Sequence, residues 1–276
     1  MKVSGVIMGF RHRFGKPIGY RLVIGDFQVD VNDWLNHAVT LSFLRERFCV
    51  HCGRKVNKLF NNGSCYPCFK NLPENDLCIV KPQECHFHLG TCRDHSFAQG
   101  HCMVPHVVYL ALSSEVKVGI TRKDNRFKRW ADQGAIQALP IAEVPTRKDA
   151  GELEFHLSQF LPDKTNWRKM LSGDVKAIDL RQVREEIQPL IPPSFRPFLL
   201  TEEEIVELVY PQLEQVKALN SWSLEKQDSY SGRLIGVKGN YLLFDSGVFH
   251  LKKHAGYRVE FVVEEKATAH NGSRDY

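Results

Sequence analysis

The chain has 276 residues, 43% of them hydrophobic and 25% charged, and a formal net charge of +5 at pH 7. These values are typical of a globular protein with two or three compact units, and no apolar stretch is long enough to span a bilayer, which argues against an integral membrane protein. The N-terminal stretch lacks an apolar run and is interrupted by charges, which predicts no export signal and a cytoplasmic location.

The first predicted elements are two β-strands and a zinc ribbon. Residues 20–31 are apolar or alternate around a Gly-Asp turn, and residues 38–44 form a second strand. Two CxxC pairs then follow, separated by twelve residues: Cys49-Val-His-Cys52 and Cys65-Tyr-Pro-Cys68. In a reducing cytosol such thiols bind zinc in preference to forming disulfides. Four thiolates leave no open coordination position, so this zinc is expected to be structural.

A second group of metal-ligating residue types follows the ribbon. It consists of four cysteines and five histidines: Cys78, Cys85, Cys92, Cys102, His86, His88, His95, His101 and His106. Their spacing matches no motif with an evident mechanism. Either the four cysteines, alone or mixed with a histidine, hold a second zinc ion, or they are buried thiols beside surface histidines. A catalytic thiol is disfavoured because Cys85 and His86 are neighbours only in sequence.

The centre of the chain alternates between strands and helices. Apolar runs at 106–112 and 116–121 predict a hairpin. Periodicity and capping residues predict helices at 125–133, 146–161, 174–188 and 201–219. The last of these begins with a Thr201-x-x-Glu204 capping box, although Pro211 interrupts it.

The C-terminal strands resemble those at the N-terminus. Strands are predicted at 241–251 and 257–263, and residues 231–236 (SGRLIG) resemble residues 4–9 (SGVIMG). Two interpretations remain open. Either both ends are related β units packed together with the rest of the chain inserted between them, or the likeness is a coincidence among hairpins with glycine turns.

One constellation in the centre resembles the GIY-YIG nuclease superfamily. Tyr109 lies on the first central strand, Lys117-Val-Gly on the second, and Arg129 on the following helix. Glu154 on the next helix and Asn166 beyond it match the later positions of that pattern. The resemblance covers about residues 106–170, and Lys117 stands where the family has its second tyrosine.

This resemblance implies a phosphodiesterase chemistry. In the family the glutamate binds a divalent ion such as Mg²⁺ or Mn²⁺, so the resemblance implies that Glu154 is the metal ligand, with Tyr109, Lys117, Arg129 and Asn166 as the other site residues. Glu154 lies beside Ala150 at the edge of the apolar face of its helix, where a carboxylate needs either a metal or an ion pair, with Arg129 or Arg168. Both alternatives are kept.

The predicted fold class is α+β, with a zinc ribbon followed by a small GIY-YIG-like α/β domain and β-rich segments at both ends. The segments are 1–48 (β-rich), 49–70 (zinc ribbon), 71–105 (Cys/His-rich, with the candidate second zinc site), 106–190 (GIY-YIG-like), 191–220 (helical connection), 221–265 (β-rich) and 266–276 (tail). The whole arrangement also resembles an uncharacterised bacterial protein family that joins such a ribbon to a KVGIT core. That resemblance implies organisation and no activity.

Basic residues gather at 45–70 and 117–129, six in each stretch against a single acid. Such clusters suit phosphate contacts, although a solvated basic face is an equal alternative. We therefore expect a protein that binds DNA or RNA and is a candidate metal-dependent endonuclease. The alternatives are a non-catalytic zinc-stabilised nucleic-acid-binding module and a protein-interaction scaffold. The sequence does not indicate an oligomeric state.

Overall fold

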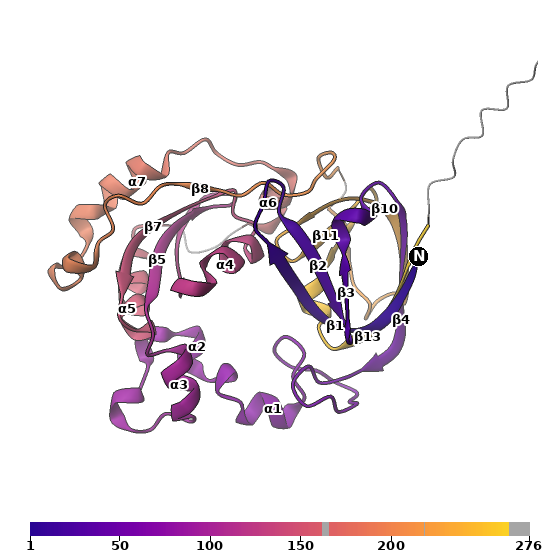
Figure 1. Ribbon diagram of the computed structural model, residues 1–276, viewed down its shortest axis with the longest axis horizontal. Coiled ribbons are helices and arrows are strands. Elements are labelled where there is room, and N and C mark those ends of the chain that lie inside the picture. The colour runs from indigo at the N-terminus through magenta and orange to yellow at the C-terminus, as the bar shows by residue number, and fades with distance from the viewer. Residues whose placement is uncertain (162–165, 218, 265–276) are drawn as a thin grey trace, which may run out of the picture.

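The computed structural model describes residues 1–161, 166–217 and 219–264. Within these residues the chain forms one sheet of nine strands, one sheet of four strands and a set of short helices. Figure 1 shows the two sheets on opposite sides of the molecule, with helix α1 (Tyr66–Asn71) on the segment that runs between them. This confirms the predicted α+β class and the β-rich ends. The predicted tail, 266–276, lies outside the described residues.

Both ends of the chain build the large sheet, whose strand order is β3-β2-β1-β13-β4-β10-β11-β12-β9. The N-terminal strands are β1 (Lys2–Arg13), β2 (Gly19–Ile24), β3 (Phe27–Asp30) and β4 (Ala38–Arg47). The C-terminal strands are β9 (Ser221–Trp222), β10 (Ser229–Lys238), β11 (Tyr241–Phe244), β12 (Val248–His250) and β13 (Tyr257–Val263). Strands β4 and β13 pair antiparallel near the middle, so each end of the chain completes the other.

The two ends also have the same order of elements. Each runs through three strands, a short 3-10 helix and a last strand. The first strands bulge at matching glycines, between Ile7 and Gly9 in β1 and between Leu234 and Gly236 in β10. Moreover, β1 pairs with β13 and β10 pairs with β4, so the partners are exchanged between the ends. The common order and the reciprocal pairing support the interpretation that the ends are related β units packed as one.

The small sheet holds the centre of the chain, in the order β6-β5-β7-β8. Its strands are β5 (His106–Leu112), β6 (Val116–Arg122), β7 (Gln137–Val144) and β8 (Val206–Glu207). The predicted hairpin of β5 and β6 is confirmed, with Tyr109 opposite Gly119. Val108 of β5 belongs to one hydrophobic core, whereas Val107 and Tyr109 belong to the core shared with the large sheet. Strand β6 is an edge strand, which leaves its outer side open to site residues.

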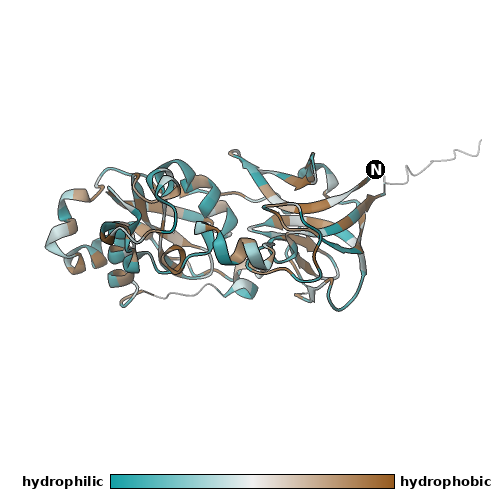
Figure 2. Cartoon of the chain, turned by 90° about the horizontal axis from the view of Figure 1, so that it is seen from below, coloured by the Kyte–Doolittle hydropathy of each residue, from teal (hydrophilic) through white to brown (hydrophobic). Residues whose placement is uncertain are grey.

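Short helices make up most of the rest of the centre of the chain. Their bounds are α2 (Leu77–Val80), α3 (His95–His101), α4 (Arg126–Asp132), α5 (Arg147–Leu157), α6 (Trp167–Ser172) and α7 (Leu180–Ile187). Helix α6 packs Met170 and Leu171 against strands β10–β12 of the large sheet. Helix α5 begins with a capping box, in which the backbone N–H of Asp149 donates to Thr146 Oγ1 and that of Thr146 donates to Asp149 Oδ2. Figure 2 shows hydrophobic segments on the strands of both sheets. Every helix in the described part of the chain is too short or too polar to cross a membrane.

The predicted helix at 201–219 is wrong for the described residues of that segment, so the helical part of the predicted connection at 191–220 is the 3-10 helix Pro193–Phe198. The segment instead contributes β8, which pairs with β7. Farther along, the carbonyls of Val209 and Pro211 accept hydrogen bonds from the N-terminal and C-terminal segments, at 2.8 Å each. These bonds to separate parts of the fold replace helical ones, and Pro211 lacks the N–H that a helix interior needs. Tertiary pairing therefore overrides the capping signal.

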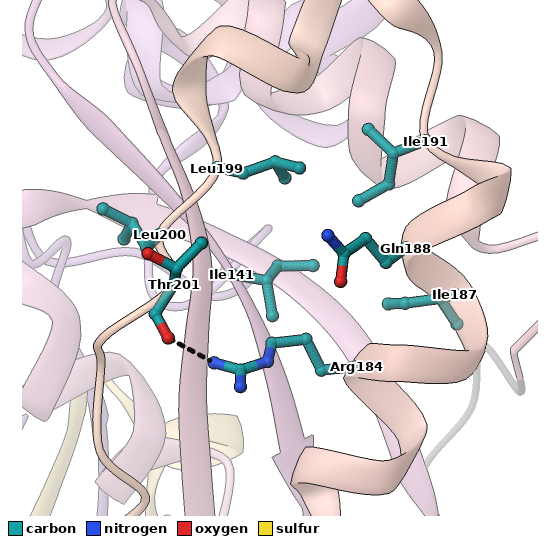
Figure 3. Close-up of a pocket in the computed structure, with 8 residues that line it drawn as sticks. All are labelled: Ile141, Arg184, Ile187, Gln188, Ile191, Leu199, Leu200 and Thr201. Atoms are coloured by element: carbon teal, nitrogen blue, oxygen red, sulfur yellow. Dashed lines mark hydrogen bonds between the residues drawn. The ribbon is translucent and has the colours of Figure 1, made fainter.

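A small pocket of about 60 Å³ lies between α7 and this extended connection (Figure 3). Arg184 on α7 donates from Nη1 to the carbonyl oxygen of Thr201, at 3.3 Å. Much of the remaining lining is aliphatic, as the side chains of Ile141, Ile187 and Leu199 show. Because its lining has neither an acid, a thiol nor an imidazole, we interpret the pocket as packing between α7 and the connection.

The 3-10 helix Leu251–His254 makes one part of the large sheet sensitive to pH. His250 precedes it, and its Nδ1 accepts a hydrogen bond from the backbone N–H of Lys253 at 3.0 Å. Burial lowers the pKa of His250 from 6.5 to about 4. Between these values the unfolded chain binds a proton that the folded chain does not, so the stability present above pH 6.5 is lost as the pH falls toward 4.

We expect His250→Asn to weaken this dependence, because asparagine can cap the helix without titrating. Urea denaturation of both proteins between pH 7 and pH 5 should show a smaller loss of unfolding free energy in the variant. The same substitution at exposed His51 is the control, and it should leave the dependence unchanged. Equal pH slopes in all three proteins would contradict the assignment.

Candidate active site and metal centre

The four ribbon cysteines form a metal-binding group. Their sulfur atoms all lie within 4.8 Å of one another, and Cys52 Sγ is 3.7 Å from Cys65 Sγ. A zinc ion with Zn–S bonds of about 2.3 Å places the sulfurs of its tetrahedron about 3.8 Å apart. Cys65 is the N-cap residue of α1, and Cys68 lies three positions later in its first turn. The four cysteines can therefore coordinate a metal such as zinc, as the sequence predicts.

The pKa values of two ribbon thiols also favour a cation bound between the four sulfurs. Burial acts to raise the pKa of Cys49, but backbone N–H groups, that of Cys65 foremost, outweigh burial and lower the pKa to about 6. A hydrogen bond with the Cys65 side chain, together with burial, raises the pKa of Cys68 to about 12. Four sulfurs this close cannot all be thiolates at neutral pH unless a cation lies between them.

A polar pocket of about 310 Å³ lies at the outer edge of β6. Its walls come from the Cys/His-rich segment, from β6, from the start of α4 and from α5. The polar residues that line it are His101, Thr121, Arg122, Asn125, Arg129, Arg147 and Glu154. Among the described residues, three guanidinium groups and a single carboxylate thus line one pocket, although Arg122 also pairs with Asp124 at 3.5 Å. Such a lining is suited to an anionic ligand that also carries a divalent cation.

Glu154 is half-buried and faces this pocket. Burial raises the pKa of its carboxyl group, while the positive charges of Arg129, Arg147 and Lys117 act to lower it. Within the described part of the chain Glu154 forms no ion pair shorter than 4.0 Å, whereas Glu152 on the same helix pairs with Lys148 at 3.8 Å. The expected alternative, an ion pair that closes Glu154, is therefore not formed, and the carboxylate is free to bind a ligand in the pocket.

Tyr109 lies behind Arg129 and is fully buried. In the amide orientation that satisfies both neighbours, the Gln133 side-chain nitrogen donates to Tyr109 Oη at 3.0 Å. The Gln133 oxygen then accepts from Arg129 Nε at 3.2 Å and Nη2 at 3.3 Å. Burial raises the pKa of Tyr109 to about 12. The phenol thus belongs to a hydrogen-bonded chain that orients the Arg129 guanidinium, and the pocket wall is formed by Arg129 itself.

Lys117 and Asn166 have different relations to the pocket. Lys117 is half-buried on β6, where burial and the charge of Arg129 lower its pKa to about 8 and Glu154 acts to raise it. Asn166 is exposed, and its Oδ1 accepts hydrogen bonds from the backbone N–H groups of Arg168 (3.0 Å) and Lys169 (3.3 Å). The structure therefore brings Lys117 into the electrostatic reach of Glu154, whereas Asn166 caps α6 and does not line the pocket.

Arg147 is a pocket residue that the sequence reasoning missed. Its Nη2 donates to the carbonyl oxygen of Ile79 at 2.8 Å, and its buried Nε has no hydrogen-bond partner in the described residues. The signal was present, because Arg147 precedes Glu154 by seven positions and two helical turns bring such residues to one face. His101 and Arg122 were missed because their segments meet only in the folded chain.

The comparisons with known proteins identify the family and no activity. A family model described as "Protein of unknown function (DUF2797)" matches residues 36–259. The chain belongs to this family. Neither a curated protein nor a solved structure matches it. The DUF2797 match contains all eight cysteines and every residue that lines the polar pocket.

In this DUF2797 chain the second cysteine group lies next to the pocket. Cys78, Cys85, Cys92 and Cys102 line one small cavity. The segment that carries them packs on α5 so closely that a Cβ added at Gly151 would lie 2.4 Å from Pro82 Cβ. The same segment contributes Ile79, Val80 and Pro82 to the polar pocket. The fold of the Cys/His-rich segment therefore determines one wall of the candidate active site.

Alanine at Gly119 should destabilise the fold and displace Tyr109. Its Cβ would lie 2.7 Å from Tyr109 Oη, and the ring cannot retreat because it is fully buried against Trp130. We expect Gly119→Ala to lower the unfolding free energy by about 1–3 kcal/mol in urea denaturation. Gly100→Ala is the control, since a Cβ there meets nothing within 4 Å and should cost nothing. An equally stable Gly119→Ala protein would contradict the tight contact.

Proposed function

We propose that this chain binds nucleic acid and hydrolyses phosphodiester bonds as a divalent-metal-dependent endonuclease of GIY-YIG type. The observation that carries the proposal is the position of Arg129 and Glu154 in one polar pocket, with Lys117 near Glu154 and Tyr109 behind Arg129. These residues come from two strands and two helices, so their meeting follows from the fold and not from sequence proximity. Because the ribbon thiols suit metal binding in a reducing compartment, we also infer a cytoplasmic location.

The pocket's positive charge supports the binding of a phosphate group. Arg122, Arg129 and Arg147 line it, against the single carboxylate of Glu154. Guanidinium groups bind phosphate oxygens in a bidentate manner, and several of them around one pocket provide both affinity and register along a nucleic-acid backbone. In this proposal Arg122 and Arg147 contact phosphate groups of the substrate.

The residues present also fit a divalent cation. Mg²⁺ is commonly held by one or two carboxylates together with substrate phosphate oxygens and water, and Glu154 offers such a carboxylate in a partly open position. When bound, Mg²⁺ or Mn²⁺ supplies Lewis-acid stabilisation of the charge that develops during hydrolysis.

The Arg129 guanidinium, oriented by Gln133 and Tyr109, stabilises the same developing negative charge. Gln133 accepts two hydrogen bonds from Arg129, and Tyr109 binds Gln133, so the guanidinium is held in place before substrate arrives. A buried phenol whose pKa is about 12 is unsuited to remove a proton from water, so Tyr109 is assigned a positioning role. Lys117, near Glu154 and Arg129, is assigned to contact the phosphate.

A non-catalytic binding module is the second candidate. Lys117 stands where the GIY-YIG nucleases have their second tyrosine, and Tyr109 is closed to solvent. Such a pocket can bind phosphate without cleaving it. If the chain is a protein-interaction scaffold, the basic clusters form a solvated surface and bind no phosphate. The surface ion pairs of Lys55 with Glu46 and of Lys123 with Glu143 support this alternative.

The test is a cleavage assay on labelled single-stranded, duplex and branched DNA and on structured RNA. Each substrate is incubated with Mg²⁺, with Mn²⁺ or with a chelator, and binding is measured at several salt concentrations. The proposal requires metal-dependent cutting of at least one substrate, with affinity that falls steeply as salt rises. Salt-sensitive binding without cutting would favour the binding module. Absence of both would overturn the nucleic-acid assignment.

A further inference from the structure

The four cysteines beyond the ribbon converge although they are spread along twenty-five residues. Cys78 lies in α2, Cys85 follows a 3-10 turn, Cys92 lies in a loop and Cys102 ends α3. All four line a single cavity. The thiols of Cys85 and Cys92 contribute to raising the pKa of both Cys78 and Cys102, where burial is the main cause, which is a further sign of their proximity.

The spacing of these sulfurs differs from that in the ribbon. The four ribbon sulfurs lie within 4.8 Å of one another, whereas no three sulfurs of the second group do so among the described residues. Moreover, the cavity between them is about 20 Å³. On the same scale one water molecule needs only about 10–15 Å³, whereas a tetrahedral zinc ion leaves no such space because its sulfurs touch. The space between the four thiols is therefore larger than a single tetrahedral metal ion leaves.

The histidine and carboxylate nearby do not offer a better site. A ligand atom of Cys78 lies within 4.8 Å of one from Asp76 and one from His86. Asp76, however, already caps α2 through the backbone N–H of Leu77 at 2.8 Å and pairs with Arg93 at 3.3 Å. The His86 Nδ1 contacts Thr91 Oγ1 at 2.8 Å. Asp76 and Arg93 line the same cavity as the four thiols but are paired with each other, which leaves the thiols as its candidate ligand set.

We propose that Cys78, Cys85, Cys92 and Cys102 bind an iron–sulfur cluster. Such clusters are held by four cysteine thiolates, which are spread over several iron atoms and so lie farther apart than around a single ion. The cluster with its thiolates is an anion, and the Arg147 guanidinium is close enough to Cys102 and Cys78 for their charges to interact. Arg147 also lines the polar pocket, so it lies between the cluster and the candidate active site.

A cluster at this position would hold the Cys/His-rich segment in the shape that forms the pocket wall. Ile79 follows Cys78 directly, and its carbonyl accepts a hydrogen bond from Arg147. The carbonyl of Cys102 accepts another from the backbone N–H of Arg147, at 2.8 Å. Loss of the cluster would free both contacts and thereby the position of Arg147. This consequence depends on the cluster alone and holds whether or not the pocket cleaves nucleic acid.

The test measures metals and sulfide in the full chain, produced with added iron and purified without oxygen. We expect iron and acid-labile sulfide in equal amounts of at least two per chain, one zinc ion, and a visible absorption that bleaches on reduction. In Cys85→Ser the iron and sulfide should be lost and the zinc kept. In Cys52→Ser the zinc should be lost and the iron kept.

Two results would overturn the proposal. One is a second zinc ion with no iron, lost in Cys85→Ser, which would assign a mononuclear site. The other is a single zinc ion without iron even after reconstitution with ferrous iron and sulfide, with all four thiols open to alkylation. Should Cys85→Ser fail to fold, Mössbauer spectroscopy of the unaltered chain decides between a cluster and adventitious iron. None of these readouts involves nucleic acid, so failure of the nuclease assignment would remain a separate result.

Discussion

Glu154→Gln is expected to abolish metal-dependent cleavage while leaving nucleic-acid binding intact. Among the described residues Glu154 is the only carboxylate that lines the polar pocket, together with the guanidinium groups of Arg129 and Arg147, whose charges act on it. Glutamine preserves its shape but removes the anionic ligand that a divalent ion needs. A bound metal ion stabilises the transition state by several kcal/mol, and each about 1.4 kcal/mol changes the rate tenfold. We therefore expect the cleavage rate to fall by at least about 100-fold.

Glu152→Gln on the same helix is the matched control. Glu152 is exposed, pairs with Lys148 and does not line the pocket. The cleavage rate of the Glu152→Gln protein should therefore stay within about twofold of that of the unaltered chain. Affinity for an uncleaved substrate analogue should be unchanged or tighter in Glu154→Gln, because a negative charge beside the phosphate is removed. Cleavage that persists in Glu154→Gln would rule out this carboxylate as the metal ligand, and equal losses in both variants would point to damage of α5.

Much of the candidate site could be predicted because its signals are local. Thr146 and Asp149 mark the start of α5 by their own capping box, and the position of Glu154 follows from the periodicity of the helix. The strand pair that carries Tyr109 and Lys117 is likewise visible as two apolar runs with a short turn. Each of these features depends on neighbours within a few residues, which a sequence displays directly.

The central strand β7 was missed because it contains a proline. Pro140 lies in the middle of residues 137–144, and proline normally argues against a central strand since it cannot donate to the ladder. In the structure Pro140 lies opposite Tyr109, where the register between β5 and β7 shifts. A bulge accommodates a residue without an N–H. That compensation involves two strands about thirty residues apart and leaves no local trace.

The complete pocket could not be predicted for a related reason. His101 and Arg122 belong to different segments, yet His101 Nδ1 and Arg122 Nη1 lie 3.4 Å apart at its rim. The role of Tyr109 depended similarly on Gln133, which links it to Arg129 from the end of α4. The burial of the phenol and its hydrogen-bond partner, which only the tertiary fold determines, place it behind the Arg129 guanidinium.

Removal of zinc is expected to unfold the ribbon without unfolding the large sheet. In zinc-finger peptides the metal contributes about 10–16 kcal/mol of apparent binding free energy. Cys49 and Cys65 are 2% and 1% exposed, so without metal two buried thiols lose their common partner. The ribbon is joined to the sheet at its base, for example through the backbone N–H of Val56, which donates to the carbonyl oxygen of Arg47 on β4 at 2.9 Å. The sheet itself is closed by the pairing of β4 and β13.

Cys65→Ala should therefore release one zinc ion per chain and make residues 49–71 susceptible to limited proteolysis, with cleavage sites mapped by mass spectrometry. His51→Ala is the matched control, because His51 lies between two ligands but is exposed and outside the metal-binding group. It should keep its zinc and its resistance. A ribbon that stays resistant after zinc loss would mean that the bridges of Phe48 with Lys55 and of Phe60 with Ser64 hold it alone. We expect the opposite, because an isolated two-stranded hairpin is only marginally stable in water.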